Sequence, residues 1–125
     1  MGQKILIIDD SMTVRKVIRS FLAAEGYDVV VTADAANVSD LMKHIKPDLV
    51  ILDIMMPQMD GYTFLRLINK DDLLNMLPVL VMSSKKKDAV KDLFSFKNVC
   101  GYIEKPFKKE ELVAIIKETL QKKIN

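Results

Sequence analysis

The stretch Leu49-Val50-Ile51-Leu52-Asp53 is an unbroken apolar run that ends on an aspartate. A second run, Ile5-Leu6-Ile7-Ile8, has the same form and is followed by Asp9 and Asp10. Continuous apolar runs of this length are typical of strands buried on both faces of a parallel sheet, because a half-exposed strand would alternate with polar residues. Both stretches therefore predict strands of an α/β fold.

Outward from these two runs, the chain alternates strands with amphipathic segments. Further strands are expected at residues 27–31, 79–82 and 102–103, and the segments between strands place apolar residues three and four positions apart. Five strand–helix units in strict alternation predict a doubly wound parallel sheet with helices on both faces. The common strand order of such a flavodoxin-like sheet is 2-1-3-4-5, and residues 1–125 are expected to form one domain.

Local signals set the expected limits of the helices. Ser11 and Asp34 are positioned to cap the first two helices, and Gly26 and Pro47 are positioned to end them. A fourth helix, predicted over 88–96, has a weaker pattern. Its inward residues are expected to be Ala89, Val90, Leu93 and Phe94.

Composition excludes several classes of protein. Half of the 125 residues are hydrophobic and 29% are charged, as in ordinary soluble domains. The formal net charge of +2 is too small to indicate nucleic-acid binding. No apolar run approaches the ~20 residues of a membrane span. The single cysteine excludes an internal disulfide and suits a reducing cytoplasm. Cys100 is expected to be a small buried hydrophobe, and most of the eight methionines are expected to fill the core.

Polar residues stand directly after the predicted strands. Asp9 and Asp10 follow the first strand, Asp53 closes the third, Ser83 follows the fourth and Lys105 follows the fifth. The carboxyl ends of parallel strands meet at one edge of the sheet, where open α/β sheets bind their ligands. Three carboxylates would therefore crowd together, and their repulsion requires a proton or a cation.

These residue types indicate phosphoryl chemistry with a magnesium ion. Mg²⁺ prefers carboxylates, water and phosphate oxygens, and the sequence has no Cys/His cluster that would favour zinc. An aspartate can act as a covalent nucleophile towards phosphorus, and Asp53 lies between the other groups. Lys105 would supply a compact positive charge, and Ser83 would supply a hydroxyl donor.

Four sequence motifs carry a family resemblance. They are IIDDS at 7–11, LDIMMPQMDG at 52–61, VMSS at 81–84 and GYIEKPF at 101–107. Together, in this order and spacing, they resemble the receiver domain of two-component response regulators, the CheY-like superfamily, from end to end.

The resemblance implies a phosphorylation site and a metal site. Asp53 would accept a phosphoryl group from the phosphohistidine of a histidine kinase or phosphotransfer protein, or from a small phosphodonor. Asp10, Asp53 and the Met55 carbonyl would bind Mg²⁺ directly, with Asp9 contributing through water. Such a chain is not a conventional enzyme, although it catalyses its own phosphorylation and dephosphorylation.

The resemblance also implies a switch. Ser83 and Tyr102 match the pair that rearranges on phosphorylation, the hydroxyl moving to the phosphoryl group and the ring turning inward. The output face towards a downstream effector would comprise the fourth and fifth helices with the fifth strand. The Lys105-Pro106 bond is expected to be cis. Met55 and Lys85 occupy variable positions that tune the lifetime of the phosphoryl group.

Two departures and two rival functions remain at this point. Ser84 stands where the family commonly has alanine, and residues 98–100 replace a stretch that commonly contains Gly-Ala.

The chain could be a pseudo-receiver that only binds partners, although the site residues are intact. An aspartyl-nucleophile phosphatase would have an aspartate two positions after Asp53, where Met55 stands. The sequence does not distinguish a stand-alone receiver from a piece of a longer protein.

Overall fold

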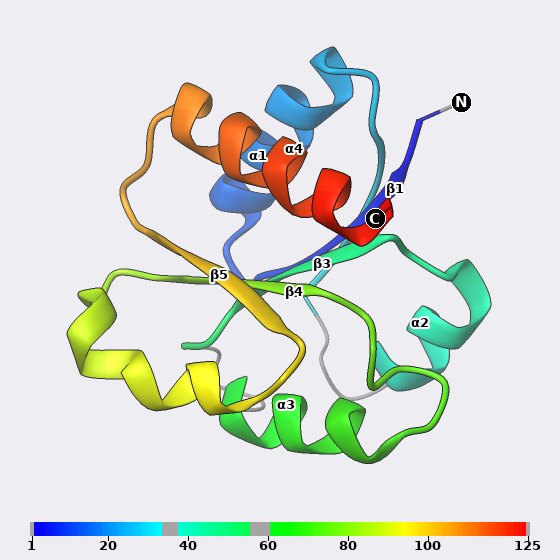
Figure 1. Cartoon of the computed structure of the whole chain (residues 1–125). Helices are drawn as coiled ribbons and strands as arrows, with labels where there is room; N and C mark the ends of the chain where they lie inside the picture. Colours follow the sequence, from blue (N-terminus) through cyan, green and yellow to red (C-terminus); the bar gives the residue numbers. More distant parts are fainter. Residues whose placement is uncertain (1, 34–37, 56–60, 125) are drawn as a thin grey trace.

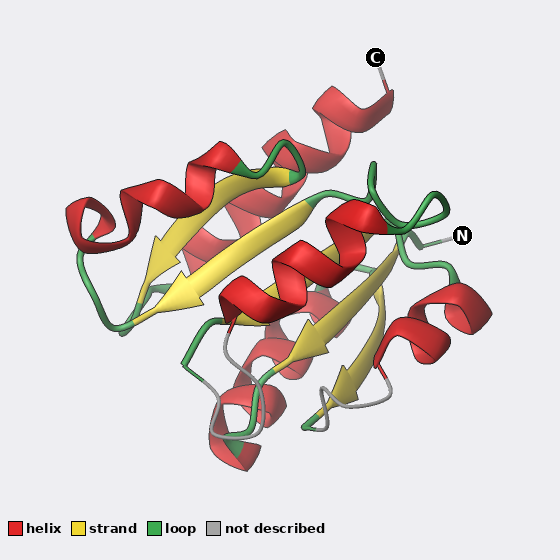
Figure 2. Cartoon of the chain, turned by 90° about the horizontal axis from the view of Figure 1, so that it is seen from below, coloured by secondary structure: helices red, strands yellow, loops and turns green. Residues whose placement is uncertain are grey.

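The structure is a computed structural model that describes residues 2–33, 38–55 and 61–124. Within these ranges, parallel strands form one sheet in the order β2-β1-β3-β4-β5, and Figure 2 shows their arrows pointing the same way. This confirms the predicted fold and strand order. The strands are β1 (Lys4–Ile8), β2 (Asp28–Thr32), β3 (Leu49–Asp53), β4 (Val79–Ser83) and β5 (Val99–Glu104).

Helices cover both faces of the sheet (Figure 1). α1 (Met12–Ala24) and α4 (Lys109–Ile124) lie on one face, and α2 (Val38–Ile45), α3 (Gly61–Lys70) and the 3₁₀ helix η1 (Lys87–Ser95) lie on the other. Successive strand residues enter opposite cores: Ile5 and Ile7 of β1 pack on the α1 side, and Leu6 on the α2 side. Among the described residues, no helix is both long and apolar enough to cross a membrane.

The start of α1 is where the sequence predicts it. Ser11 is the N-cap, and its Oγ accepts a hydrogen bond from the Val14 N–H at 3.2 Å. Gly26 follows the helix with a φ of 89°, a left-handed conformation that glycine adopts without strain. Asp34, the second expected cap, lies outside the described residues, as do residues 56–60 of the second motif. The cap places the first turn of α1 directly after Asp9 and Asp10.

The fourth helix departs from the prediction. It is a 3₁₀ helix, interrupted at Val90, where φ is −127° and ψ is 21°. Val90 and Leu93 are buried and Phe94 is half-buried, but Ala89 is exposed, so its inward placement was wrong. The physical reason is the tighter winding: with three residues per turn, positions three apart such as 90 and 93 share a face and position 89 does not.

Cys100 is exposed, which corrects the prediction that it is buried. Val79 pairs with Val99 but Leu80 pairs with Gly101, so Cys100 is an extra residue in the β4–β5 ladder. Such a bulge redirects the side chain away from the face that strict alternation would give it. The Cys100 thiol donates a hydrogen bond to the Val79 carbonyl at 3.2 Å.

The methionines also depart in part from the expected core role. Met42 and Met82 are buried as expected. Met12, Met55 and Met76 are 60%, 54% and 77% exposed, so the core assignment is wrong for these three. Met12 is the first residue of α1, and Met55 lies just after the carboxyl end of β3. Met76 lies between α3 and β4. Amphipathic position alone therefore did not decide their burial.

Candidate functional site

The carboxyl edge of the sheet gathers the residues that the sequence singled out. Asp9 follows β1, Asp53 is the last residue of β3, Ser83 is the last residue of β4, and Lys105 follows β5. In Figure 2 the tips of the strand arrows end on the same side of the molecule. Parallel strand direction is therefore what brings these distant positions together.

Three carboxylates lie close together at this edge. Asp9, Asp10 and Asp53 each offer an oxygen, and these oxygens lie within 4.8 Å of one another. Asp9 is fully buried and Asp53 is 5% exposed, whereas Asp10 is exposed to solvent. A set of oxygen donors with one open side fits a hard divalent cation such as Mg²⁺, which keeps several waters.

Lys105 bridges the two buried carboxylates. Its Nζ donates to Asp9 Oδ2 at 3.0 Å and to Asp53 Oδ2 at 3.1 Å. The backbone around it is held as well, because the Lys105 N–H donates to the Ser83 carbonyl at 2.7 Å. The Lys105-Pro106 bond is cis, as the resemblance implied. The lysine ammonium is thus positioned between the predicted nucleophile and its neighbouring acid.

The second oxygen of each buried carboxylate is held by the backbone. Asp9 Oδ1 accepts from the Ser11 N–H at 2.8 Å, and Asp53 Oδ1 accepts from the Met55 N–H at 2.9 Å. Each carboxylate therefore has one oxygen on a peptide N–H and the other on Lys105. This arrangement fixes the planes of both groups. The Met55 carbonyl as a metal ligand stays a prediction.

Burial and charge oppose each other in this cluster. Burial raises the pKa of Asp9, and the hydrogen bonds from Ser11 and Lys105 only partly offset that rise. For Lys105, burial acts to lower the pKa, but the hydrogen bonds to Asp9 and Asp53 outweigh it and raise the pKa overall. Lys105 therefore stays protonated, while the acidic cluster still favours additional positive charge.

Ser83 and Tyr102 are linked through one backbone unit. Ser83 is 1% exposed, and its Oγ accepts from the Lys85 N–H at 3.1 Å. The Tyr102 hydroxyl donates to the carbonyl of the same Lys85, and its ring is half-buried against the core on the η1 side. The predicted switch pair is thus joined by the peptide groups of Lys85.

Two contributors to the site were missed by sequence reasoning. Lys85 was noted only as a variable side chain, and its role as a backbone bridge leaves no side-chain signal. Arg15, from the first turn of α1, donates from Nη1 to the Asp9 carbonyl at 2.8 Å. The sequence does place this cationic residue in the first turn of the helix that follows Asp9 and Asp10, and that position could have indicated the contact. Both residues support the site without contributing a predicted reactive group.

Comparison with known proteins agrees with this fold and site. The sequence model of the response regulator receiver domain family matches residues 5–117 of the chain. Protein PilG of Pseudomonas aeruginosa is 36% identical over 118 residues, covering 93% of this chain and 86% of PilG. The DNA-binding response regulator MtrA of Mycobacterium tuberculosis H37Rv is 33% identical over 123 residues, covering 98% of this chain and 52% of MtrA. The chain therefore spans about half the length of MtrA.

These matches place the chain in a class of signalling module. The chain belongs to the response regulator receiver domain family of two-component systems. A solved structure supports the fold: the receiver domain of the sensor histidine kinase PA1611 from Pseudomonas aeruginosa, with a magnesium ion coordinated in its active-site cleft. It has a TM-score of 0.86 and 24% identity, and the match covers 97% of this chain and 99% of that one.

Proposed function

We propose that this chain accepts a phosphoryl group on Asp53 and passes the signal on by changing its partner binding. The donor is the phosphohistidine of a histidine kinase or phosphotransfer protein, or a small phosphodonor. One observation carries this proposal: Asp53 is a buried carboxylate at the carboxyl edge of the sheet, hydrogen-bonded to Lys105 at 3.1 Å and next to two further aspartates. Such a set suits an aspartyl nucleophile.

The proposed step is a phosphoryl transfer between two nucleophiles. A carboxylate oxygen of Asp53 forms a bond to phosphorus, the phosphorus–nitrogen bond to the donor imidazole breaks, and its electron pair stays on that nitrogen. The Met55 N–H holds the Asp53 carboxylate in orientation. Lys105 stabilises negative charge on the transferring group, which is most of what this chemistry requires of a protein. The chain then catalyses its own phosphorylation and hydrolysis rather than turning over a separate substrate.

Mg²⁺ is the proposed cofactor. Asp9, Asp10 and Asp53, with the Met55 carbonyl, would hold it. When bound, the ion supplies positive charge to the carboxylates and to phosphate oxygens. The PA1611 receiver domain carries such an ion. Because that likeness shows the fold alone, support for the ion here comes from the carboxylate oxygens of this chain, which lie within 4.8 Å of one another.

The switch is proposed to run from Ser83 to Tyr102. The Ser83 Oγ accepts from Lys85, and no acceptor for its own hydroxyl hydrogen is found among the described residues, so that hydrogen can turn to a phosphoryl oxygen. Movement of Ser83 would shift the peptide groups of Lys85, and Tyr102 would move with them through its hydrogen bond to the Lys85 carbonyl. We expect the effector protein to bind the face formed by η1, β5 and α4. We place this exchange in the cytoplasm, without direct nucleic-acid contact or membrane insertion by this chain.

A phosphate-affinity gel tests the central claim. Wild-type protein treated with acetyl phosphate and Mg²⁺ should give a shifted band, and Asp53→Asn should give none while keeping its fold. Asp71→Asn is the matched control, because this aspartate lies outside the cluster, and it should shift like wild type. Absence of a shifted band for wild type would support the pseudo-receiver alternative. A shifted band for Asp53→Asn would place the phosphoryl group elsewhere.

Tyr102→Phe tests the proposed relay separately from the chemistry. This variant loses the hydrogen bond to the Lys85 carbonyl, a change of about 1 kcal/mol in the free energy of unfolding. Its gel shift should equal that of wild type. The response of η1 amide resonances to beryllofluoride should be smaller than in wild type. An unchanged η1 response would show that the signal does not pass through this hydroxyl.

A further inference from the structure

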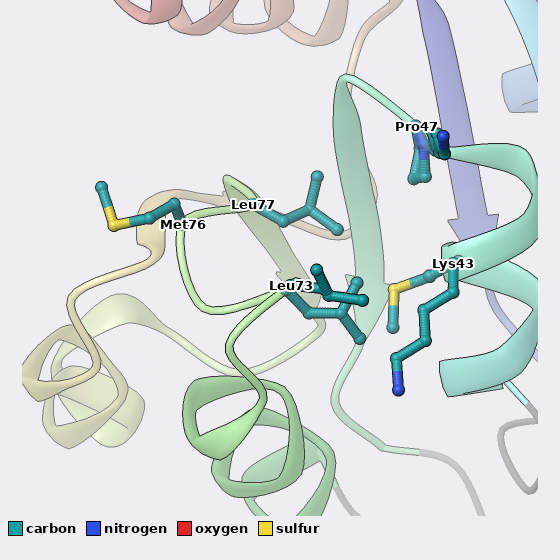
Figure 3. A pocket seen from close by; sticks show the side chains of 8 residues that line it. Lys43, Pro47, Leu73, Met76 and Leu77 are labelled. Atoms are coloured by element: carbon teal, nitrogen blue, oxygen red, sulfur yellow. The ribbon is translucent and has the colours of Figure 1, made fainter.

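A cavity of about 350 Å³ lies at the opposite edge of the sheet from Asp53. Its walls come from the end of α2, which leads into the amino end of β3, and from residues 73–77, which lead into the amino end of β4. Figure 3 shows Lys43 and Leu73 on facing sides of this space. Because the strands are parallel, the cavity and the phosphorylation site lie at opposite ends of the same strands.

The walls of the cavity are apolar and tied together. Met42 and Leu74 are buried in its lining. The Lys43 Nζ lies 2.9 Å from Asp71 Oδ2, which joins α2 to the segment after α3. The other oxygen of Asp71 accepts from the Leu73 N–H at 2.8 Å, so the same carboxylate also holds the start of the second wall. The cavity is therefore formed before anything binds.

Two apolar residues of the cavity lining also expose much of their side chains to solvent. Leu73 and Met76 are 78% and 77% exposed, the highest values among the large exposed hydrophobics of the described residues. In Figure 3, Met76 points away from the cavity rather than into it. A small molecule confined to the cavity would leave such side chains in water, whereas a protein segment would cover them. The exposed apolar side chains thus favour a polypeptide over a small ligand.

The charged residues that line the cavity indicate the charge of a binding partner. Both charged residues that line the cavity are lysines. Lys43 is neutralised by Asp71, but Lys46 is exposed and forms no ion pair among the described residues. Lys46 has a φ of 52°, the left-handed conformation that often follows the end of a helix. One uncompensated cation therefore stands at the rim of an apolar cavity.

We propose that this cavity docks a segment of a partner protein that presents a large apolar side chain beside acidic side chains. The apolar side chain enters the cavity, the acidic group pairs with Lys46, and flanking apolar surface covers Leu73 and Met76. Because the cavity lies at the far edge of the sheet, docking is independent of the phosphoryl state of Asp53. A second copy of this chain fits poorly, since a two-fold contact would bring two Lys46 side chains into one interface.

A peptide titration of the full chain tests this docking surface. The probe is a blocked amphipathic peptide with leucines three and four residues apart and glutamates elsewhere; its matched control has lysines in place of the glutamates. Amide resonances of residues 42–46 and 73–77 should move with the glutamate peptide and not with the lysine peptide. The affinity should be the same with and without beryllofluoride. Equal response to both peptides, no response, or a response only with beryllofluoride would overturn the proposal.

Substitutions at exposed positions localise the effect without threatening the fold. Lys46→Glu should weaken the glutamate peptide about fivefold, as expected for one exposed charge pair. Lys16→Glu, which makes the same charge change on α1, should leave the affinity unchanged. Leu73→Ser should weaken binding of the peptide in either phosphoryl state. Equal losses for Lys46→Glu and Lys16→Glu would reduce the effect to net charge. Concentration-dependent dimers that Leu73→Ser abolishes would identify a second copy as the occupant instead, and either result would contradict the proposal.

Discussion

The two edges of the sheet each hold a lysine–aspartate contact of nearly the same length. At the carboxyl edge Lys105 lies 3.0 Å from Asp9 and 3.1 Å from Asp53, and at the amino edge Lys43 lies 2.9 Å from Asp71. Each lysine acts to lower the pKa of its aspartate, yet the net shifts of the two acids are opposite. The pKa of Asp9 is raised, first by burial, whereas the pKa of Asp71 is lowered, first by its hydrogen bond from Lys43.

Burial, not distance, separates the two contacts. The Asp9 side chain is fully buried, whereas the Asp71 side chain is 21% exposed and its partner Lys43 is 40% exposed. A fully buried carboxylate loses its hydration, and one partner does not replace it, whereas a partly exposed carboxylate keeps some water and gains the partner as well. The carboxyl edge thus holds charge that is unfavourable for folding but available to a cation or a phosphoryl group. The amino edge holds an ion pair that only stabilises structure.

The largest effect is expected for Lys105→Ala. Removing this lysine leaves Asp9 and Asp53 buried without their shared partner, which should lower the free energy of unfolding by about 3 kcal/mol at neutral pH. Urea unfolding would measure the loss. The loss should shrink in acid, because Asp9 can then take up a proton. A loss independent of pH would show that lost packing, rather than uncompensated charge, is responsible.

The raised pKa of Lys105 determines the alkaline pH at which this lysine stops stabilising the fold. The stabilisation is fully present below the ordinary value of 10.5 and is lost as the pH rises through the higher folded-state pKa.

Lys105→Ala should still bind Mg²⁺, measured by titration, yet fail to couple phosphorylation to the change in shape. Loss of metal affinity outright would contradict the assigned role of Lys105.

An intermediate effect of opposite sign is expected for Asp9→Asn. With its pKa raised above 3.8, the folded chain binds the Asp9 proton more tightly than the unfolded chain, so stability falls as the pH rises above about 4. Replacing the carboxylate by an amide should therefore stabilise the metal-free protein at neutral pH and weaken Mg²⁺ binding. Urea unfolding across this pH range and a Mg²⁺ titration measure both. Asp28→Asn, at an exposed position, should change neither, and a less stable Asp9→Asn would contradict the burial argument.

Much of the carboxyl edge could be predicted from the sequence. Asp9, Asp53, Ser83 and Lys105 each follow an apolar run, and parallel strand direction then brings every strand end to one edge. The prediction needed only the pattern of runs and the topology that the pattern implies. No contact between side chains had to be known in advance.

The remaining features depend on contacts that no local pattern encodes. The bridge through Lys85 uses peptide groups, which every residue has. The exposure of Cys100 follows from a register shift against β4. The Lys43–Asp71 contact joins α2 to a segment beyond α3, so neither residue signals it alone. These features became visible only when distant segments were placed side by side.

The smallest effect is expected for Lys43→Ala at the amino edge. The lowered pKa of Asp71 means that its stabilisation is present above 3.8 and is lost as the pH falls through its folded-state pKa, the opposite response to that of Asp9. Because the pair is partly exposed to solvent, salt screens it, whereas the contacts of Lys105 with the buried Asp9 and Asp53 are screened much less. Urea unfolding should show a slight loss for Lys43→Ala at low salt and none at high salt, while the loss for Lys105→Ala persists in both. If the two variants lost equal stability in high salt, contact distance rather than burial would govern both edges of the sheet.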